Sequence, residues 1–296
     1  MSAPLPVEKY YSRLETKLGF RMLLGGASHH AYYRKSTTSP FPLSEGLRAM
    51  EDRLMLKLGA RPGDKVMDAG CGTGVVAMHL AEYGIRVTGI DILPEHIAKA
   101  NEYAEAANVR DTVRFVRGDI QQIGTEADSF DGVFAMEVLS QVVDVPVALQ
   151  EMYRVLKPGR KIAIFDIEHK KLEDMDDAVA RSAYVVKRAI GGHWADFGSY
   201  KTWLEEVGFV DVQIEDLSEN IAPMGRLFRA LSAVPYAIIQ PLGLSKHFPN
   251  MYAGHNMYSN AARKNWKYLA ISAKKPLAED EKPRKENPFT DKFAIN

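Results

Sequence analysis

Short apolar runs alternate with helical patterns through the middle of the chain. Five of these runs are apolar at nearly every position, as expected for strands of a parallel sheet that is covered on both faces. They cover residues 65–70, 86–91, 113–119, 131–137 and 161–168. The segments between them predict helices over 74–83, 94–107 and 145–156, and two further runs, 209–217 and 267–275, complete a sheet of seven strands. This pattern predicts a doubly wound α/β fold with a Rossmann-like sheet, whose last strand we expect to be antiparallel.

Two aromatic-rich segments lie outside this alternation. Residues 222–265 separate the last two predicted strands, where a hairpin would need only a few residues, and residues 1–60 precede the first. We expect a helical N-terminal cap over 1–60 and an α/β domain over 61–276 that contains a helical insertion at 222–265. The charged tail over 277–296 is predicted to be disordered. The aromatic residues of the two caps either pack onto the core or line a site. The apolar side chains of the caps also offer a surface through which a homo-oligomer could form.

Composition and charge narrow the classes of partner. The 296 residues include 38 Lys and Arg and 38 Asp and Glu, so the formal net charge is +0 and nucleic acid is not an expected partner. The single cysteine, Cys71, cannot form an intramolecular disulfide, which favours a reducing compartment. We find no secretory signal and no apolar stretch long enough to span a bilayer, so we expect a cytoplasmic protein without an integral membrane segment.

The strongest local motif follows the first predicted strand. It reads Asp68-Ala69-Gly70-Cys71-Gly72-Thr73-Gly74 and leads into an apolar helix. Glycines allow a tight turn and let a ligand approach the backbone, and the start of the helix offers free N–H groups, so a nucleotide-like ligand is indicated. The second strand ends in Asp91, from where a carboxylate can bind both hydroxyls of a ribose. The third ends in Gly118-Asp119-Ile120, where an adenine ring can rest. A helix N-cap is the structural alternative for Asp91.

The chain resembles class I S-adenosylmethionine-dependent methyltransferases over about residues 60–220. The resemblance rests on the glycine-rich loop, on the strand ends at Asp91 and Gly118-Asp119, and on the segment from FDGVFAME to EMYRVLKPG. Within that class the chain is most similar to the sterol C-methyltransferase and ubiquinone/menaquinone methyltransferase group. The resemblance implies S-adenosylmethionine as the cofactor. A dehydrogenase that binds NAD would carry G-x-G-x-x-G, whereas this loop carries glycine at every second position from Gly70 to Gly74.

The resemblance also implies roles for individual residues. Asp68 and the loop residues Gly70, Cys71, Gly72 and Gly74 are expected around the methionyl part, Asp91 and Ile92 at the ribose, Asp119 and Ile120 beside the adenine, and Glu137 beside the sulfonium. Glu137 is alternatively an ordinary charged strand end. No metal is expected: the acidic run 173–177 is better explained as the solvated start of a helix, and no His/Cys cluster has the spacing of a zinc site.

A general base is the uncertain part of the predicted chemistry. Relatives in this group carry histidine four residues after the strand-ending glutamate, and this chain has Gln141 there. The catalytic candidates are therefore His169, His193, Glu137 and Tyr11, with His29-His30 a further pair; for each histidine a structural role is the alternative. The sequence is also compatible with a reaction that needs no general base.

The predicted function is methyl transfer to a lipophilic small molecule of sterol, terpenoid, quinone or polyketide type. The missing histidine slightly favours carbon over oxygen as the acceptor, because a carbocation needs aromatic faces and carboxylates such as Glu137 and Glu168 rather than a base. Two alternatives stay open: a catalytically silent protein that still binds S-adenosylmethionine, and an N-methyltransferase of a small amine.

Overall fold

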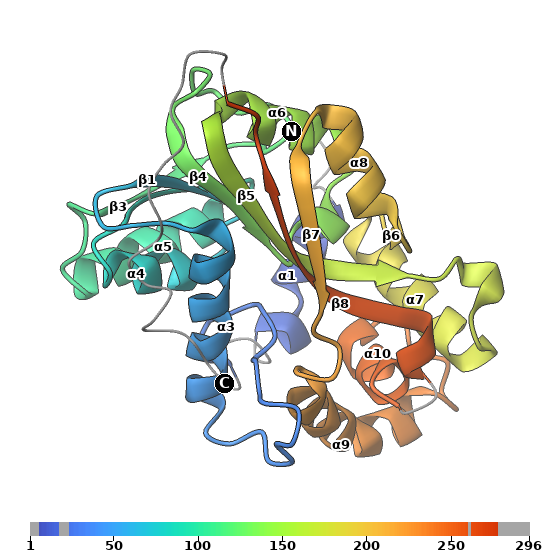
Figure 1. Cartoon of the computed structure of the whole chain (residues 1–296). Coiled ribbons are helices and arrows are strands. Elements are labelled where there is room, and N and C mark those ends of the chain that lie inside the picture. The colour runs from blue at the N-terminus through green and yellow to red at the C-terminus, as the bar shows by residue number, and fades with distance from the viewer. Residues whose placement is uncertain (1–5, 18–23, 260–261, 278–296) are drawn as a thin grey trace, which may run out of the picture.

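The computed structural model describes residues 6–17, 24–259 and 262–277, and one mixed sheet runs through its centre (Figure 1). The strands run in the order β3-β2-β1-β4-β5-β8-β7, and the two-residue β6 pairs with the end of β5. Their bounds are β1 (Lys65–Ala69), β2 (Arg86–Asp91), β3 (Val113–Arg117), β4 (Phe130–Met136), β5 (Leu156–His169), β6 (Ala195–Asp196), β7 (Val210–Asp216) and β8 (Trp266–Lys274). The predicted sheet of seven strands is confirmed, with β6 as a short addition.

Pairing within the sheet follows the apolar pattern. β1 lies between β2 and β4 and pairs with both in parallel, whereas β8 is antiparallel to both β5 and β7, as predicted. Four of the five residues of β1 are buried, because a central strand is covered by helices on both faces.

Helices cover the two faces of the sheet with two separate apolar clusters. One cluster joins the sheet to α3 (Leu43–Leu58), α4 (Val75–Ala81) and α5 (Pro94–Ala106). The other joins it to α6 (Val145–Val155) and α8 (Ser199–Val207). The helices predicted over 74–83, 94–107 and 145–156 therefore form at nearly those bounds, with Pro94 starting α5 where its missing N–H costs nothing.

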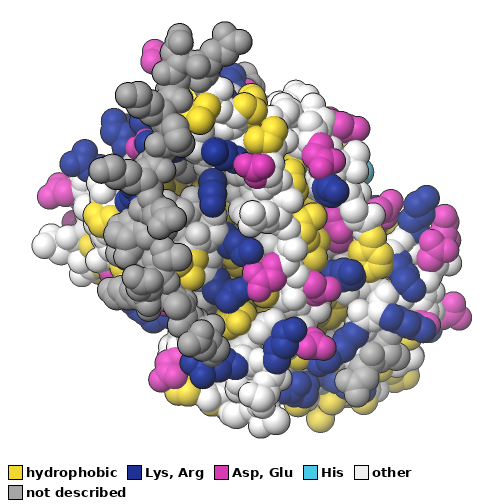
Figure 2. Space-filling model, viewed as in Figure 1, with side chains coloured by type: hydrophobic (Ala, Val, Ile, Leu, Met, Phe, Trp, Pro, Cys, Tyr) yellow, Lys and Arg dark blue, Asp and Glu magenta, His cyan; other side chains and the backbone are white. Residues whose placement is uncertain are grey.

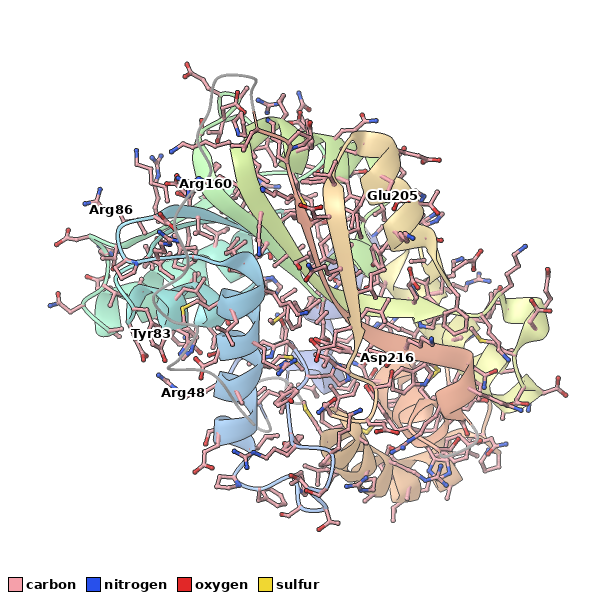
Figure 3. The ribbon with its side chains drawn as sticks, viewed as in Figure 1. Arg48, Tyr83, Arg86, Arg160, Glu205 and Asp216 are labelled. Atoms are coloured by element: carbon pink, nitrogen blue, oxygen red, sulfur yellow. The ribbon has the colours of Figure 1, made fainter. Side chains whose placement is uncertain are left out.

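Four more helices gather beyond the sheet, on the side where the parallel strands end (Figure 1). They are α1 (Pro6–Ser12), α7 (Asp177–Ile190), α9 (Ala222–Ile239) and α10 (Pro249–Met257). The acidic run 173–177 leads into α7, as the sequence indicated. Figure 3 shows Arg160 at the end of the sheet where β4 and β5 begin and Asp216 toward the other end, where β7 finishes.

The proposed division into domains stays a prediction, and all of the tail except Leu277 lies outside the described residues. No helix in the described ranges is both long and apolar enough to cross a membrane.

Candidate functional site

A cavity of about 130 Å³ opens at the carboxyl ends of β1, β2, β3 and β4. It lies at the switch point of the doubly wound sheet, where successive crossovers turn to opposite sides and ligands bind in such folds. Most residues that the resemblance assigns to the cofactor line it: Gly70, Gly72, Asp91, Ile92, Asp119, Ile120 and Glu137. Tyr11, near the end of α1, also lines this cavity.

The glycine-rich loop needs glycine for steric reasons. Gly70 has φ +83°, and a Cβ there would lie 2.2 Å from Val138 Cγ2. Gly74 is left-handed at the start of α4, and its Cβ would lie 2.4 Å from the Phe115 ring. Side chains at these positions would push apart the loop and its neighbouring strand. Gly74 therefore shapes the turn without lining the cavity itself.

Asp68 is a buried carboxylate with an unused acceptor. Its Oδ2 accepts no hydrogen bond within the described chain, and the residue is 3% exposed. Burial raises its pKa well above the usual range, and the charge of Asp91 adds to this effect while His29 opposes it. Together with Gly70 and Cys71 it borders a small cavity of about 20 Å³. An unpaired buried carboxylate suits a cationic ligand, so the site fits the methionyl amine of S-adenosylmethionine.

Asp91 ends β2 and organises the loop around it. Its Oδ2 accepts the Gly72 N–H at 2.9 Å, and its Oδ1 accepts the Leu93 N–H at 2.8 Å. The His96 ring lies beside it, with Nδ1 3.3 Å from Oδ2. The carboxylate thus tightens the turn that leads into α5 and still lines the cavity, but the N-cap residue of α5 is Leu93 and no side chain caps that helix, so the helix-cap interpretation of Asp91 is wrong.

A second, larger cavity of about 310 Å³ adjoins the first. Its walls come from α1, α7, α9, α10 and the chain around residues 24–30, and they are mainly apolar and aromatic. The two cavities share the wall residues Tyr11, Ser28, Glu137, Gln141 and Ile190. A cofactor in the first cavity would therefore face a lipophilic molecule in the second across this shared wall.

Glu137 stands at the centre of the shared wall with a strained backbone. It has φ +54°, which is rare for a residue with a side chain and is often found at functional sites. Its Oε1 accepts hydrogen bonds from the His30 backbone N–H at 2.6 Å, from His30 Nδ1 at 2.9 Å and from the Tyr268 hydroxyl at 2.8 Å. Burial alone would raise its pKa, but the neighbouring His30 donors hold that pKa below its usual range. Glu137 is therefore an ionised acceptor.

His30 links Glu137 to a third aromatic side chain. Its Nδ1 faces a carboxylate oxygen and so carries a proton, while Nε2 lies 2.7 Å from the Tyr258 hydroxyl. When Nε2 is unprotonated, Tyr258 donates to it; when Nε2 is protonated, the Tyr258 hydroxyl proton is free to point elsewhere. Both His30 and Tyr258 line the larger cavity. The pair can thus present either an acceptor or a donor to a molecule there.

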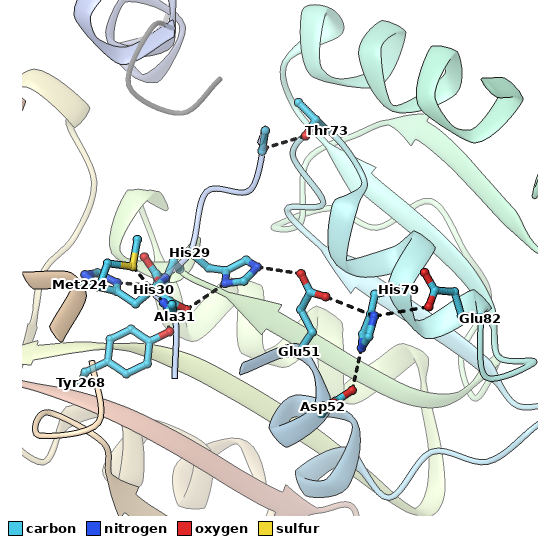
Figure 4. Close-up of polar contacts among 12 residues, drawn as sticks. His29, His30, Ala31, Glu51, Asp52, Thr73, His79, Glu82, Met224 and Tyr268 are labelled. Carbon is cyan, nitrogen blue, oxygen red and sulfur yellow. Dashed lines mark hydrogen bonds and ion pairs between the residues drawn. The ribbon is translucent and has the colours of Figure 1, made fainter. Parts of the chain in front are cut away.

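A buried chain of histidines and acids continues away from the site (Figure 4). His29 donates from Nδ1 to the His30 carbonyl oxygen at 3.0 Å, and its Nε2 lies 3.2 Å from Glu51. Glu51 also approaches His79, whose Nε2 lies 2.7 Å from Asp52. Burial would lower the pKa of His29, but Glu51 reverses this and raises it. This chain holds the peptide that directs His30 toward Glu137.

The other predicted catalytic residues lie in different surroundings. His169 lines the larger cavity, but its ring stacks on Trp194 at 4.3 Å, and burial lowers its pKa to about 3, which keeps it neutral. His193 lines none of the cavities described, and its ring packs against Trp203. Gln141 donates to the Glu137 carbonyl oxygen at 2.8 Å.

One sequence expectation needs correction, and one role was missed. Glu168 does not join the cavity wall: its carboxylate accepts the N–H groups of Gly198 and Tyr200 at the start of α8. Asp166, two residues earlier, lines the larger cavity instead. Tyr258 and Tyr268 were not predicted as partners of Glu137 and His30, because they come from distant segments and follow no local motif. Among the described residues, no group of three or more His, Cys, Asp or Glu is arranged to hold a metal ion.

Known proteins resemble the chain along most of its length. A family model described as a methyltransferase domain matches residues 67–164. An S-adenosyl-L-methionine-dependent Diels-Alderase of Talaromyces variabilis is 35% identical over 93% of this chain and 96% of that protein. A second enzyme of that description, from Neonectria sp., is 32% identical over 70% and 83% of the two chains. The 27-O-demethylrifamycin SV methyltransferase of Amycolatopsis mediterranei is 31% identical over 75% and 81%.

Solved structures share the fold. The crystal structure of the [4+2]-cyclase SpnF covers 94% of this chain and 99% of its own, with a TM-score of 0.72 and 21% identity. A geranyl diphosphate methyltransferase in complex with geranyl diphosphate and sinefungin covers 91% and 97%, with a TM-score of 0.70 and 17% identity.

Proposed function

The chain belongs to the class I S-adenosylmethionine-dependent methyltransferases, and we propose that it uses this fold to catalyse a Diels–Alder cycloaddition within a lipophilic polyene. Its cofactor is S-adenosylmethionine. When bound, that cofactor supplies a sulfonium centre, which carries a positive charge and an activated methyl group. The Asp68 carboxylate, the 70–74 loop and Asp91 would hold it, and Glu137 would stand between it and the larger cavity.

The observation that carries the proposal is the shared wall between the two cavities. Donors and ring faces surround the larger cavity, and three groups suited to remove a proton are already engaged: Glu137 accepts three hydrogen bonds, His169 is stacked and buried, and His30 Nε2 lies 2.7 Å from the Tyr258 hydroxyl. A cycloaddition needs no base. Two carbon–carbon σ bonds form and two π bonds are consumed within one molecule, so neither a proton nor a leaving group has to be handled.

The residues of the larger cavity would act by shape and polarisation. The rings of Phe228 on α9 and of Tyr258, which directly follows α10, narrow the space in which a flexible chain can fold, which lowers the entropy lost on reaching the transition state. When His30 donates from Nε2 to the Tyr258 oxygen and from Nδ1 to Glu137, the Tyr258 hydroxyl would donate to a carbonyl conjugated with the dienophile. The resemblance in sequence to two Diels-Alderases supports this assignment.

A test uses a synthetic linear polyene that carries a conjugated diene and an unsaturated carbonyl on one chain. Incubation with the protein and S-adenosylmethionine should give a cyclised isomer of unchanged mass, faster than in buffer. A product heavier by one methylene would instead establish methyl transfer, and no acceleration with several such polyenes would overturn the cycloaddition.

Methyl transfer to carbon of a lipophilic acceptor is the second candidate. It is favoured by the position of Tyr11, Glu137 and Gln141, which lie where the two cavities meet and a donor and an acceptor would face each other. Methyl transfer to oxygen or to a protonated amine would require His30 as the base.

A cytoplasmic location stays a prediction from the single Cys71.

A further inference from the structure

Helix α9 presents an apolar face to solvent. Its exposed positions are Arg226, Ala230, Leu231, Val234, Ala237 and Ile238, and all but the first are apolar. Val234 is 71% exposed and Ile238 56%, and the successive spacings of three and four residues place them on one side of the helix. Leu242, which is 63% exposed, continues the stripe beyond the helix. We call Leu231, Val234, Ile238 and Leu242 the α9 stripe.

The segment that carries this stripe has an unusual charge composition. No Asp or Glu occurs from residue 220 to residue 278, although the whole chain has equal numbers of acidic and basic residues. Residues 222–265 carry five Lys and Arg: Arg226, Arg229, Lys246, Arg263 and Lys264. Arg226, Arg229 and Lys246 form no ion pair within the described chain. In Figure 2, Lys and Arg side chains gather over the lower part of the molecule, where α9 and α10 lie, with hydrophobic side chains between and below them.

Positive groups flank the stripe at both ends. Arg226 is exposed near the start of α9, and its Nη2 donates to the carbonyl oxygens of Thr37 and Thr38. Beyond the far end, Lys246 is exposed, and the Arg13 guanidinium donates to its carbonyl oxygen at 3.0 Å. An apolar stripe between cationic groups is typical of a helix that lies in the interface of a membrane.

The stripe is continuous with the larger cavity. Leu231 lines that cavity and is also 47% exposed, so it stands at the rim. Met224, Phe228 and Ser232 of α9 also contribute to the cavity wall. A surface that covered the stripe would therefore lie next to an entrance for a lipophilic molecule.

We propose that the α9 stripe docks on an anionic lipid surface. The positive charge of the segment that carries it selects this occupant over a second copy of the chain, because a two-fold contact through the same face would bring equal positive charges together. The apolar side chains would enter the boundary between headgroups and acyl chains, and the cations would bind the anionic headgroups. The docking surface is separate from the cofactor cavity and goes beyond the proposed reaction.

The test is cosedimentation of the full chain with vesicles. We expect binding to vesicles of phosphatidylcholine and phosphatidylserine in a ratio of about three to one, weaker binding to phosphatidylcholine alone, and release by high salt. The double variant Val234→Glu and Ile238→Glu should lower the partition coefficient by about tenfold or more. Val210→Glu, on the exposed edge strand β7, is the matched control and should bind as the wild type does.

Two further measurements keep the outcomes distinct. Affinity for S-adenosylmethionine should be equal in all three proteins, which shows that the double variant is folded and separates this inference from the proposed function. Light scattering should give a monomer in each case. Absence of wild-type binding to the anionic vesicles would overturn the proposal, and so would a wild-type dimer that the double variant converts to a monomer.

Discussion

His30 presents two hydrogen-bond donors to a single oxygen of Glu137: its backbone N–H lies 2.6 Å and its Nδ1 2.9 Å from Oε1. This relationship joins the N-terminal segment to the end of β4 across the boundary between the two cavities. It fixes the charge of Glu137 and the orientation of the His30 ring together. The remaining ring nitrogen is thereby directed at Tyr258 in the larger cavity.

Replacement of Glu137 by glutamine should destabilise the fold. All three donors bind Oε1, and the glutamine amide oxygen would be a neutral acceptor in place of an ionised one, so each of these buried hydrogen bonds would lose its charge assistance. We expect a loss of about 1–3 kcal/mol in the free energy of unfolding, measured by urea denaturation. Glu205→Gln, on the exposed surface of α8, is the control and should change it little. Equal stability of the two variants would contradict the assigned network.

Tyr258→Phe should slow the reaction without affecting the cofactor. The variant keeps the ring in the cavity wall and removes only the hydroxyl, so we expect kcat to fall by about tenfold or more while the Kd for S-adenosylmethionine is unchanged. Tyr236→Phe, on α9, is the matched control, because Tyr236 is outside the lining of the larger cavity. Unaltered turnover in Tyr258→Phe would exclude the hydroxyl from the chemistry.

Asp91→Ala should weaken cofactor binding. The variant removes the carboxylate that we assign to the ribose and that accepts the Gly72 and Leu93 N–H groups. We expect affinity for S-adenosylmethionine to fall by about tenfold or more, or about 1.5–3 kcal/mol, in calorimetric titration. Asp111→Ala, at an exposed position before β3, should bind normally. A Kd that Asp91→Ala leaves intact would refute the ribose assignment.

His169 should make the fold sensitive to acid. Burial, together with the charge of Lys187, lowers its pKa to about 3, whereas its ordinary value is 6.5. Between these values the unfolded chain binds a proton that the folded chain does not, so His169 contributes stability above pH 6.5 that is lost as the pH falls. The slope is about 1.4 kcal/mol per pH unit for one proton.

The variant His169→Phe isolates this effect. Burial raises the pKa of Asp166 to about 6 from 3.8, so between those values Asp166 gives a slope of opposite sign in both proteins. The difference between the wild-type and variant stability curves should therefore change with pH below 6.5, measured by urea denaturation. His247→Gln, at an exposed position, should not alter the curve. Parallel curves for wild type and His169→Phe would show that His169 is accessible to protons in the folded state.

The sheet and the cofactor loop were predictable because their signals are local. Apolar runs define the strands, Pro94 marks the start of α5, and the glycines from Gly70 to Gly74 require one turn geometry. Since parallel strands end at one edge of a sheet, Asp91 and Asp119 could be placed near each other from the pattern alone. The structure puts both in the wall of one cavity.

The substrate side of the site was less predictable because it depends on long-range packing. His30, Tyr258 and Tyr268 are brought to Glu137 from segments more than a hundred residues away. Glu168 and Asp166 lie two residues apart on β5, and the sequence pattern does not distinguish them. Only Asp166 lines the larger cavity, since Glu168 binds the start of α8. The alternation of side chains along β5 does not show which of the two carboxylates hydrogen-bonds to a neighbouring helix.

The most direct test of the central claim is the fate of the cofactor's methyl group during turnover. The reaction should be run with the synthetic polyene and S-adenosylmethionine that carries an isotopic label in that methyl group, and label in the product and S-adenosylhomocysteine should be quantified against product formed. We predict a cyclised product without label and no S-adenosylhomocysteine above the level without substrate. One labelled methyl group and one S-adenosylhomocysteine per product molecule would contradict the account and establish methyl transfer.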